Sequence, residues 1–469
     1  MNSGELWRIS ATELGRMLRA GELSPVELLD ATLRRIERLN PAINAIIATD
    51  ETGARAAAKD SENRLRSGQS RGPLEGVPLT AKDHILVKGM PATWGSKVFA
   101  DFVPETDELP VTRLRDAGAI ILGKTNVPEF TLAEYTDNLV FGVTRNPWNL
   151  ELTPGGSSGG AVASVAAGLT SVAIGTDAGG SIRRPASHTG LVGFKPSIGR
   201  VARCNGFPKI LLDLEVCGPL GRTVADTKMV FDAMAGPSRL DRRSNLVPVR
   251  NGHRDRLRIL YVERFGDSPL DPEVASSVLE AVDVISNLGH DVVSGELPID
   301  LSEVTAAWPI IGAVGISHLF DLHPHAPGLV SPRFIEMAAA GAAATSSQYL
   351  GVIETLDRFR GQVGTAFEDI DVIMTPSAAA LPWSADTPYP DVIDGQPVGR
   401  RGHAVYTGWV NACGHPAINL PAAHSASGLP IGFQLIGDFG ADGMLFDLAA
   451  QYEEISPWSD RWPDFAETT

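Results

Sequence analysis

Residues 155–160 read Gly-Gly-Ser-Ser-Gly-Gly, and residues 175–183 read Gly-Thr-Asp-Ala-Gly-Gly-Ser-Ile-Arg. The first turn holds Ser157 and Ser158, and the second carries Ser181 directly after its glycine pair. Glycine lets the backbone approach a ligand closely and aim consecutive N–H groups at one point. A serine beside such donors is typical of a nucleophile that faces an oxyanion hole. The two turns together therefore predict a serine-based active site.

The composition is that of an ordinary globular protein. Of the 469 residues, 43% are apolar and 20% are charged. Forty basic against 56 acidic side chains give a net charge of −16, which argues against nucleic acid and anionic membranes as partners. The three cysteines have no C-x-x-C spacing, so neither a disulfide framework nor a thiolate metal site is expected.

The N-terminal segment does not resemble a targeting signal. It lacks a continuous apolar run, so a secretory signal is not expected. The longest low-charge stretch, residues 161–176, is too short and too rich in Ala, Gly and Ser to span a bilayer. We therefore expect a cytoplasmic enzyme without a membrane partner.

Helix and strand signals alternate along most of the chain. Ser24, Pro25 and Glu27 form a helix start signal, and the helical pattern that follows is expected to stop at Pro41. Strands are predicted at 77–83, 119–122, 172–175, 258–265, 291–293, 416–421 and 430–437, and later helices at 112–116, 161–168 and 272–288. Such alternation predicts an α/β fold with an open mixed sheet and helices on both faces.

A serine nucleophile needs a base that takes its proton. No Gly-x-Ser-x-Gly elbow is present, and His84, His188 and His415 are each more typical of structural histidines. Lys82 ends an apolar run, and burial lowers the proton affinity of a lysine. Taken alone, Lys82 would be interpreted as a solvated loop lysine.

Several ordered motifs extend this pattern beyond the two turns. They are 76–83 (Gly-Val-Pro-Leu-Thr-Ala-Lys-Asp), 123–126 (Gly-Lys-Thr-Asn), 142–147, 154–160, 175–185, 190–196 (Gly-Leu-Val-Gly-Phe-Lys-Pro) and 428–434 (Gly-Leu-Pro-Ile-Gly-Phe-Gln). With these motifs the sequence resembles the amidase signature family, most clearly over residues 70–235 and 405–437.

The resemblance implies a Ser–cis-Ser–Lys catalytic unit. Ser181 would be the nucleophile, Ser157 the bridging serine in a cis peptide, and Lys82 the base. Ser158 would be a hydrogen-bonding neighbour. The backbone N–H groups of Ala178, Gly179, Gly180 and Ser181 would form the oxyanion hole. Asp177 and Arg183 flank the nucleophile, and we interpret them as a structural ion pair that fixes the turn.

The resemblance also implies the architecture of the whole chain. Residues 1–469 would form a single domain around a large mixed, mainly parallel twisted sheet covered by helices on both faces. Within it, residues 1–70 would be an N-terminal helical segment, 70–235 the core that carries the motifs, and 298–400 a variable substrate-pocket region. A homodimer is also expected.

Residues 118–125, Gly-Ala-Ile-Ile-Leu-Gly-Lys-Thr, fit the phosphate-loop pattern and offer a different class of function, nucleotide binding. A phosphate loop must follow a strand, whereas residues 120–122 themselves have the composition of the strand. Pro128 would also interrupt the helix that should begin after Lys124. This alternative is therefore disfavoured.

The predicted function is hydrolysis of small apolar or aryl amides, anilides and carbamates (urethanes) through an acyl-enzyme, without a metal or organic cofactor. Trp308, Trp383, Tyr406 and Trp409 are candidate pocket aromatics. The alternative is a glutamine-hydrolysing subunit of a tRNA-dependent amidotransferase. Residues 404–411 contain no carboxylate for glutamine's ammonium group, which favours the free-standing amidase.

Overall fold

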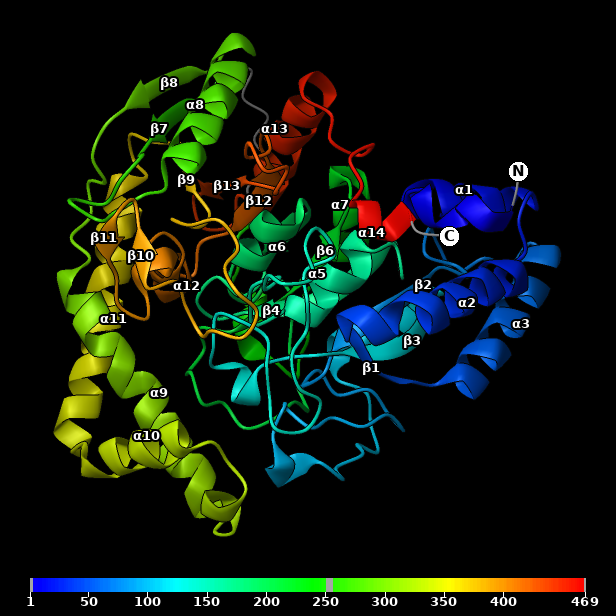
Figure 1. Ribbon diagram of the computed structural model, residues 1–469, viewed down its shortest axis with the longest axis horizontal. Coiled ribbons are helices and arrows are strands. Elements are labelled where there is room, and N and C mark those ends of the chain that lie inside the picture. Colours follow the sequence, from blue (N-terminus) through cyan, green and yellow to red (C-terminus); the bar gives the residue numbers. More distant parts are fainter. Residues whose placement is uncertain (1–2, 250–255, 468–469) are drawn as a thin grey trace.

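An eleven-stranded sheet runs through the computed structural model, which describes residues 3–249 and 256–467 (Figure 1). In sheet order the strands are β1 (Ile46–Thr49), β3 (Ile120–Thr125), β2 (Pro78–Lys82), β4 (Val172–Asp177), β6 (Val216–Gly221), β5 (Val192–Lys195), β12 (Ala417–Pro421), β13 (Gly432–Gly437), β9 (Val372–Pro376), β7 (Arg258–Tyr261) and β8 (Asp291–Ser294). Parallel pairing joins β2 to β3 and β4, and β7 to β8 and β9, whereas the six other neighbouring pairs of described strands are antiparallel. The predicted mixed sheet is confirmed, and its parallel pairs lie in two separate blocks.

Both faces of the sheet are buried under helices. In β4, Val172 and Ile174 pack into one apolar cluster, whereas Ala173, which points to the opposite face, packs into another. One face carries α1 (Ala11–Ala20), α4 (Leu109–Asp116), α7 (Val224–Met234), α8 (Pro272–Asn287) and α13 (Asp442–Ile455). The other carries α2 (Pro25–Ile43), α3 (Glu51–Arg66), α5 (Gly159–Ala166), α6 (Arg183–Thr189), α11 (Ser346–Ala366) and α12 (Gly408–Cys413). Helices on both faces are therefore confirmed.

The remaining elements are small or lie at the margin. A two-stranded sheet pairs β10 (Val392–Ile393) with β11 (Gln396–Pro397), and α14 (Asp464–Glu467) lies near the C-terminus. Short 3-10 helices cover Ser3–Arg8, Lys97–Phe99, Glu129–Thr131, Arg242–Asn245, Ala326–Gly328 and Gly402–Ala404.

The N-terminal helices start as predicted but end differently. The Ser24–Glu27 capping box is present at the start of α2. The helix passes through Pro41 and ends at Ile43, so the expected stop at Pro41 is wrong. It ends there because Asn44 takes a left-handed φ of 50° and its amide donates to the Asn40 carbonyl at 2.7 Å. Strand β1, between α2 and α3, was missed because its four residues carry too short a pattern.

At one side of the molecule α9 (Ser302–Leu322) and α10 (Pro332–Ala343) pack with α11 in a helical projection (Figure 1). Among the described helices, α9 is the one long and apolar enough to cross a membrane. Its Val304, Ala307 and Ile311 pack into the cluster that holds α11, and core helices pass the same test of length and composition. Residues 161–176, which the sequence analysis considered instead, form α5, the turn after it and part of β4.

The sheet brings two catalytic candidates to one edge. Strands β2 and β4 are parallel neighbours, with Ala81 opposite Ile174. Their carboxyl ends, Lys82 and Asp177, therefore lie at the same edge of the sheet. Strand β6 runs antiparallel to β4, so the residues that lead into β6 reach this edge too.

Candidate active site

Lys82, the last residue of β2, is fully buried and makes three hydrogen bonds. Its Nζ donates to Ser157 Oγ at 2.8 Å, to Thr176 Oγ1 at 3.1 Å and to the Thr176 carbonyl at 3.3 Å. Burial lowers the pKa of the amine to about 7, although the carboxylates of Glu215 and Asp177 act in the opposite direction. A substantial fraction of Lys82 is therefore uncharged near neutral pH, as a base must be.

Ser157 and Ser158 form the first glycine turn, and the Gly156–Ser157 peptide bond is cis. Both serines are buried. The Ser158 hydroxyl donates to the Thr176 carbonyl at 3.2 Å, the same oxygen that accepts from Lys82. The Ser158 amide donates to the Ser181 carbonyl at 3.2 Å, so the backbones of the two glycine turns are hydrogen-bonded to each other.

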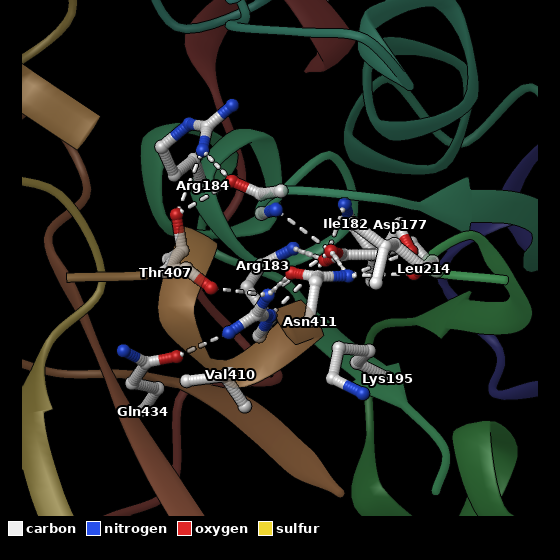
Figure 2. Close-up of polar contacts among 12 residues, drawn as sticks. Asp177, Ile182, Arg183, Arg184, Lys195, Leu214, Thr407, Val410, Asn411 and Gln434 are labelled. Carbon is white, nitrogen blue, oxygen red and sulfur yellow. Dashed lines mark hydrogen bonds and ion pairs between the residues drawn. The ribbon is translucent and has the colours of Figure 1, made fainter. Parts of the chain in front are cut away.

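The Ser181 turn is built around the carboxylate of Asp177, which is fully buried (Figure 2). The amides of Gly180 and Ile182 donate to this carboxylate at 2.7 and 3.0 Å, and Arg183 binds it through Nε at 3.1 Å and a terminal nitrogen at 3.0 Å. Burial alone would raise the pKa of Asp177, but the guanidinium and the amides hold it well below its usual range. The expected ion pair is therefore present and holds the backbone on both sides of Ser181.

Arg183 in turn links the turn to the C-terminal third of the chain. Its guanidinium also donates to Gln434 Oε1 at 2.8 Å and to Asn411 Oδ1 at 2.7 Å, and the Asn411 amide donates to Asp177 Oδ1 at 2.9 Å (Figure 2). Residues from β4, α6, α12 and β13 thus share one buried network. Such networks stabilise strongly when every member has a partner, as is the case for this ion pair.

The oxyanion-hole prediction needs one correction. The Gly180 amide donates to Asp177, so it is already used within the turn and cannot be counted as a free donor. Within the described chain the amides of Ala178, Gly179 and Ser181 have no internal acceptor, which leaves these three as candidate donors. The Gly179 carbonyl accepts hydrogen bonds from Thr407 Oγ1 at 2.8 Å and from Arg184, and these bonds fix the orientation of this part of the turn.

Gly180 is required by its conformation and by its neighbours. Its φ is +112°, a region that residues with a side chain rarely adopt. A Cβ at this position would lie 2.2 Å from Thr407 Oγ1 and 2.3 Å from an Arg184 nitrogen. The conformation of this turn therefore depends on glycine.

Four residues in this site were not identified from sequence: Thr176, Thr407, Asn411 and Gln434. Asn411 and Gln434 lie in segments that the sequence analysis quoted, but an amide side chain in a strand or helix carries no signal of its partner. Thr176 precedes Asp177 in the second quoted turn, and only the packing of β2 on β4 brings its hydroxyl to Lys82.

The disfavoured candidates lie elsewhere or have other partners. Lys124, the lysine of the phosphate-loop pattern, lies in β3, where its Nζ donates to the carbonyls of Asp83 and Ile85 at 2.6 Å each. His188 contacts the Ala380 carbonyl, and His415 lies 3.5 Å from Asp438. In the described part of the chain, no cluster of three or more His, Cys, Asp or Glu side chains is arranged to hold a metal ion.

Trp308, which lies next to Gly179, lines a cavity of about 640 Å³, although no residue of either glycine turn is among the residues that line it. Trp308 and Arg401 line it, and a Cβ at Gly179 would lie 3.3 Å from the Trp308 ring and 3.7 Å from the Arg401 guanidinium. Trp409 also lines it. Tyr406, by contrast, is a core residue whose hydroxyl donates to the Glu263 carbonyl.

Trp383, the fourth aromatic candidate, packs against the rings of His188 and His403 and is not among the residues that line this cavity. The cavity wall includes Trp308 from the predicted segment 298–400, but Arg401 and Trp409 follow that segment.

Comparison with known proteins identifies the family. The family model described as Amidase matches residues 27–446. An acylamidase of Rhodococcus erythropolis is 33% identical over 481 residues, covering 99% of this chain and 98% of its own. A glutamyl-tRNA(Gln) amidotransferase subunit from Moorella thermoacetica is 34% identical, covering 98% of this chain and 99% of its own. The crystal structure of a bacterial aryl acylamidase of the amidase signature family superposes with a TM-score of 0.89 at 28% identity, covering 98% of this chain and 99% of that one.

The family match spans nearly the whole chain, and the fold agrees with that of the solved relative. The resemblance drawn from the motifs is confirmed, and the phosphate-loop alternative is ruled out by the place of residues 118–125 at the start of and within β3. This chain therefore belongs to the amidase family, the amidase signature enzymes, and is an enzyme that hydrolyses amide bonds.

Proposed function

We propose that the chain is a free-standing amidase in which Ser181 is the nucleophile, Ser157 the bridging serine and Lys82 the base. The observation that carries the proposal is the 2.8 Å hydrogen bond from the fully buried Lys82 amine to Ser157 Oγ, beside the turn that holds Ser181. A buried lysine with a pKa of about 7 has the proton affinity that a base needs at neutral pH.

The proposed proton path runs from Ser181 through Ser157 to Lys82. Neutral Lys82 takes the Ser157 hydroxyl proton while Ser157 takes that of Ser181, and Ser181 Oγ forms a bond to the substrate carbonyl carbon. The amides of Ala178, Gly179 and Ser181 are the proposed donors to the resulting oxyanion. Each well-placed donor lowers such a barrier by about 3 kcal/mol.

Collapse of this intermediate breaks the C–N bond and releases the amine, which receives the proton back from Lys82 through Ser157. Water then attacks the acyl-enzyme by the same proton route, and the carboxylic acid leaves with Ser181 restored. Asp177 and Arg183 act by holding the turn, and Ser158 by tying it to the first one.

The cavity supports substrates with apolar or aromatic groups. Trp308 supplies a flat apolar surface next to the Gly179 turn, and Trp409 lines the same cavity. Small aryl amides and anilides fit such a wall. Carbamates (urethanes) belong to the same proposal, because the proposed oxyanion donors recognise the carbonyl oxygen rather than the atoms that flank it.

The amidotransferase subunit is the second candidate, because such subunits share 34% identity over nearly the whole chain. Against it, residues 404–411 carry no carboxylate. Two acids do line the cavity, Glu296 and Asp300, so the lack of a carboxylate holds for the segment 404–411 alone; Asp300 also accepts from Ser302, at 2.9 Å on each oxygen. Glutaminase activity, or a partner chain that co-purifies, would favour this candidate over the free-standing amidase.

The acyl-enzyme is the direct test. After rapid quenching with an aryl ester or anilide, mass spectrometry of tryptic peptides is expected to find the acyl group on Ser181. Ser181→Ala should abolish this adduct and reduce turnover by at least about 10⁴-fold, without a change in the unfolding midpoint. Ser164→Ala, which removes another buried hydroxyl in α5, is the matched control and should still acylate. An acyl group on any other residue would refute the assignment of the nucleophile.

The homodimer and the cytoplasmic location remain predictions. Light scattering of the purified chain tests the first, and cell fractionation tests the second.

A further inference from the structure

Next to Lys82 lies a group of polar side chains that the proposed mechanism does not use. Thr176 Oγ1, which accepts from Lys82 at 3.1 Å, lies 3.3 Å from Glu215 Oε2 and 3.3 Å from His84 Nε2. His84 Nε2 is also 3.3 Å from Glu215 Oε2. These three side chains come from separate segments that meet at the edge where β2 and β4 end and β6 begins.

Glu215 is the charged member of this group. It shares the guanidinium of Arg203 with a second carboxylate, Glu108, which binds Arg203 Nε at 2.6 Å. Because two carboxylates share one guanidinium, Glu108, Arg203 and Glu215 together carry a net charge of −1. Burial alone would raise the pKa of Glu215, but His84 and Arg203 hold it well below its usual range, so Glu215 stays ionised at neutral pH.

Through Glu215, this group also links the buried Lys82 to the solvent-exposed surface. The side chain of Lys82 is 0% exposed and that of His84 2%, whereas that of Glu215 is 22% exposed. Glu215 and His84 line a second cavity, of about 200 Å³, whose rim includes the exposed residues Asn205 and Lys209.

The charged and titratable groups that face Lys82 are few: Glu215 ahead of β6, Asp177 at the end of β4, Arg203 from the loop after β5, Cys217 in β6 and His84 after β2. The charge of Asp177 is matched by Arg183. Burial lowers the pKa of His84, although Glu215 acts in the opposite direction, and burial raises the pKa of Cys217 to about 12, so Cys217 is neutral near pH 7. Glu215 is therefore the acid whose charge acts on Lys82 without a dedicated counter-charge.

We propose that Glu215 is a positioning residue for Lys82: acting through Thr176 and His84, it holds the amine against Ser157 and sets the pH at which the amine becomes a base. This inference rests on the proposed role of Lys82. Glu215 favours the ammonium form of Lys82. The proton that Lys82 takes from Ser157 therefore stays on Lys82 until it is transferred to the leaving amine. Removing its charge makes Lys82 lose its proton at lower pH.

The test is the pH dependence of kcat/KM for Glu215→Gln. The wild-type profile should rise with a midpoint near pH 7, and in Glu215→Gln this midpoint should move down by about one pH unit. Glu108→Gln is the matched control, because it removes a carboxylate from the same arginine but makes no contact with Thr176, His84 or Lys82 in the described chain. Its midpoint should move clearly less than that of Glu215→Gln, because Glu215 is the first of the charges that act on Lys82 and Glu108 is not among those named.

Two outcomes of this experiment overturn the inference: no shift in Glu215→Gln, or an equal shift in Glu108→Gln, which would place the effect on Arg203. A wild-type profile with no midpoint between pH 5 and 9 would instead count against Lys82 as the base, and so against the proposed function.

A second pair of variants tests the same path if Glu215→Gln does not fold. Thr176→Ser keeps the hydroxyl and should keep kcat within about threefold, whereas Thr176→Val should lower kcat by about tenfold with little change in KM. Equal losses in both variants would show that the methyl group, and not the hydroxyl, matters, and would contradict the inference.

Discussion

The core that carries the motifs, residues 70–235, and the projection formed by α9, α10 and α11 meet at the Ser181 turn, and they are built differently. In the core, Asp177 and Arg183 are fully buried, and each is held by partners from distant segments. The projection packs mainly by apolar contact, and Trp308 presents a half-buried ring to the cavity. Polar groups in a buried network have fixed partners, whereas an apolar wall can change shape at a cost that scales with area. We therefore expect substitutions in the buried polar network to reduce catalysis strongly, whereas substitutions in the apolar cavity wall should be tolerated better and should mainly change which substrates are accepted.

Among the variants that test this comparison, the largest effect is expected at Lys82, the proposed base. Lys82→Met keeps most of the apolar volume but removes the amine, and kcat should fall by about 10³-fold. In the wild type, where burial lowers the pKa of Lys82 to about 7, roughly 10% of the amine is neutral at pH 6 and roughly 90% at pH 8. Activity should therefore rise between these pH values, as measured by initial rates across the range.

Lys124→Met controls for the loss of a buried lysine as such. Lys124 binds only the carbonyls of Asp83 and Ile85 within the described chain, so its variant should lose stability yet keep the same pH midpoint. A changed pH midpoint in Lys124→Met would indicate that loss of any buried lysine of the core affects the pH dependence of activity. The midpoint could then not be assigned to Lys82 alone.

A smaller effect is expected when the network around the turn is broken. Asp177→Asn leaves the charge of Arg183 uncompensated, so the free energy of unfolding should fall by about 3–5 kcal/mol. Turnover should fall by about 10²-fold, because the turn that aims the backbone donors is no longer held. Urea denaturation and kcat measure the two losses. Asp232→Asn, which breaks an exposed pair with Lys228, should change neither.

The smallest effect is expected in the cavity wall. Trp308→Ala removes an aromatic surface from the cavity, and kcat/KM for an anilide with an aryl acyl group should fall by about tenfold. The value for acetamide, which is too small to reach the wall, should stay the same. An equal loss with both substrates would mean that Trp308 acts on the Ser181 turn itself, and the two regions would then not be separable.

The sequence signals succeeded where local geometry is enough. The capping box at Ser24, the strand predicted at 77–83 and observed at Pro78–Lys82, and the two glycine turns were all found, because each depends on residues close together in the chain. The failures were of two kinds. In the large sheet, strands β1, β5, β6 and β9 were not predicted, because their four to six residues carry too short a pattern, and the length of α2 was set by Asn44 rather than by Pro41.

For the site, the glycine-rich turns pointed to Ser181, because glycine lets backbone donors approach a reacting group beside a serine. The family resemblance added Lys82 and Ser157 as candidates, and the pair of Asp177 with Arg183 was expected from their places beside the turn. The tertiary structure decided the rest: that the Gly180 amide is used by Asp177, that Asn411 and Gln434 complete the network, and that Glu215 faces the amine through Thr176. Proton affinity and hydrogen-bond direction depend on groups far apart in the chain, and only the packing of strands and helices around them brings those groups together.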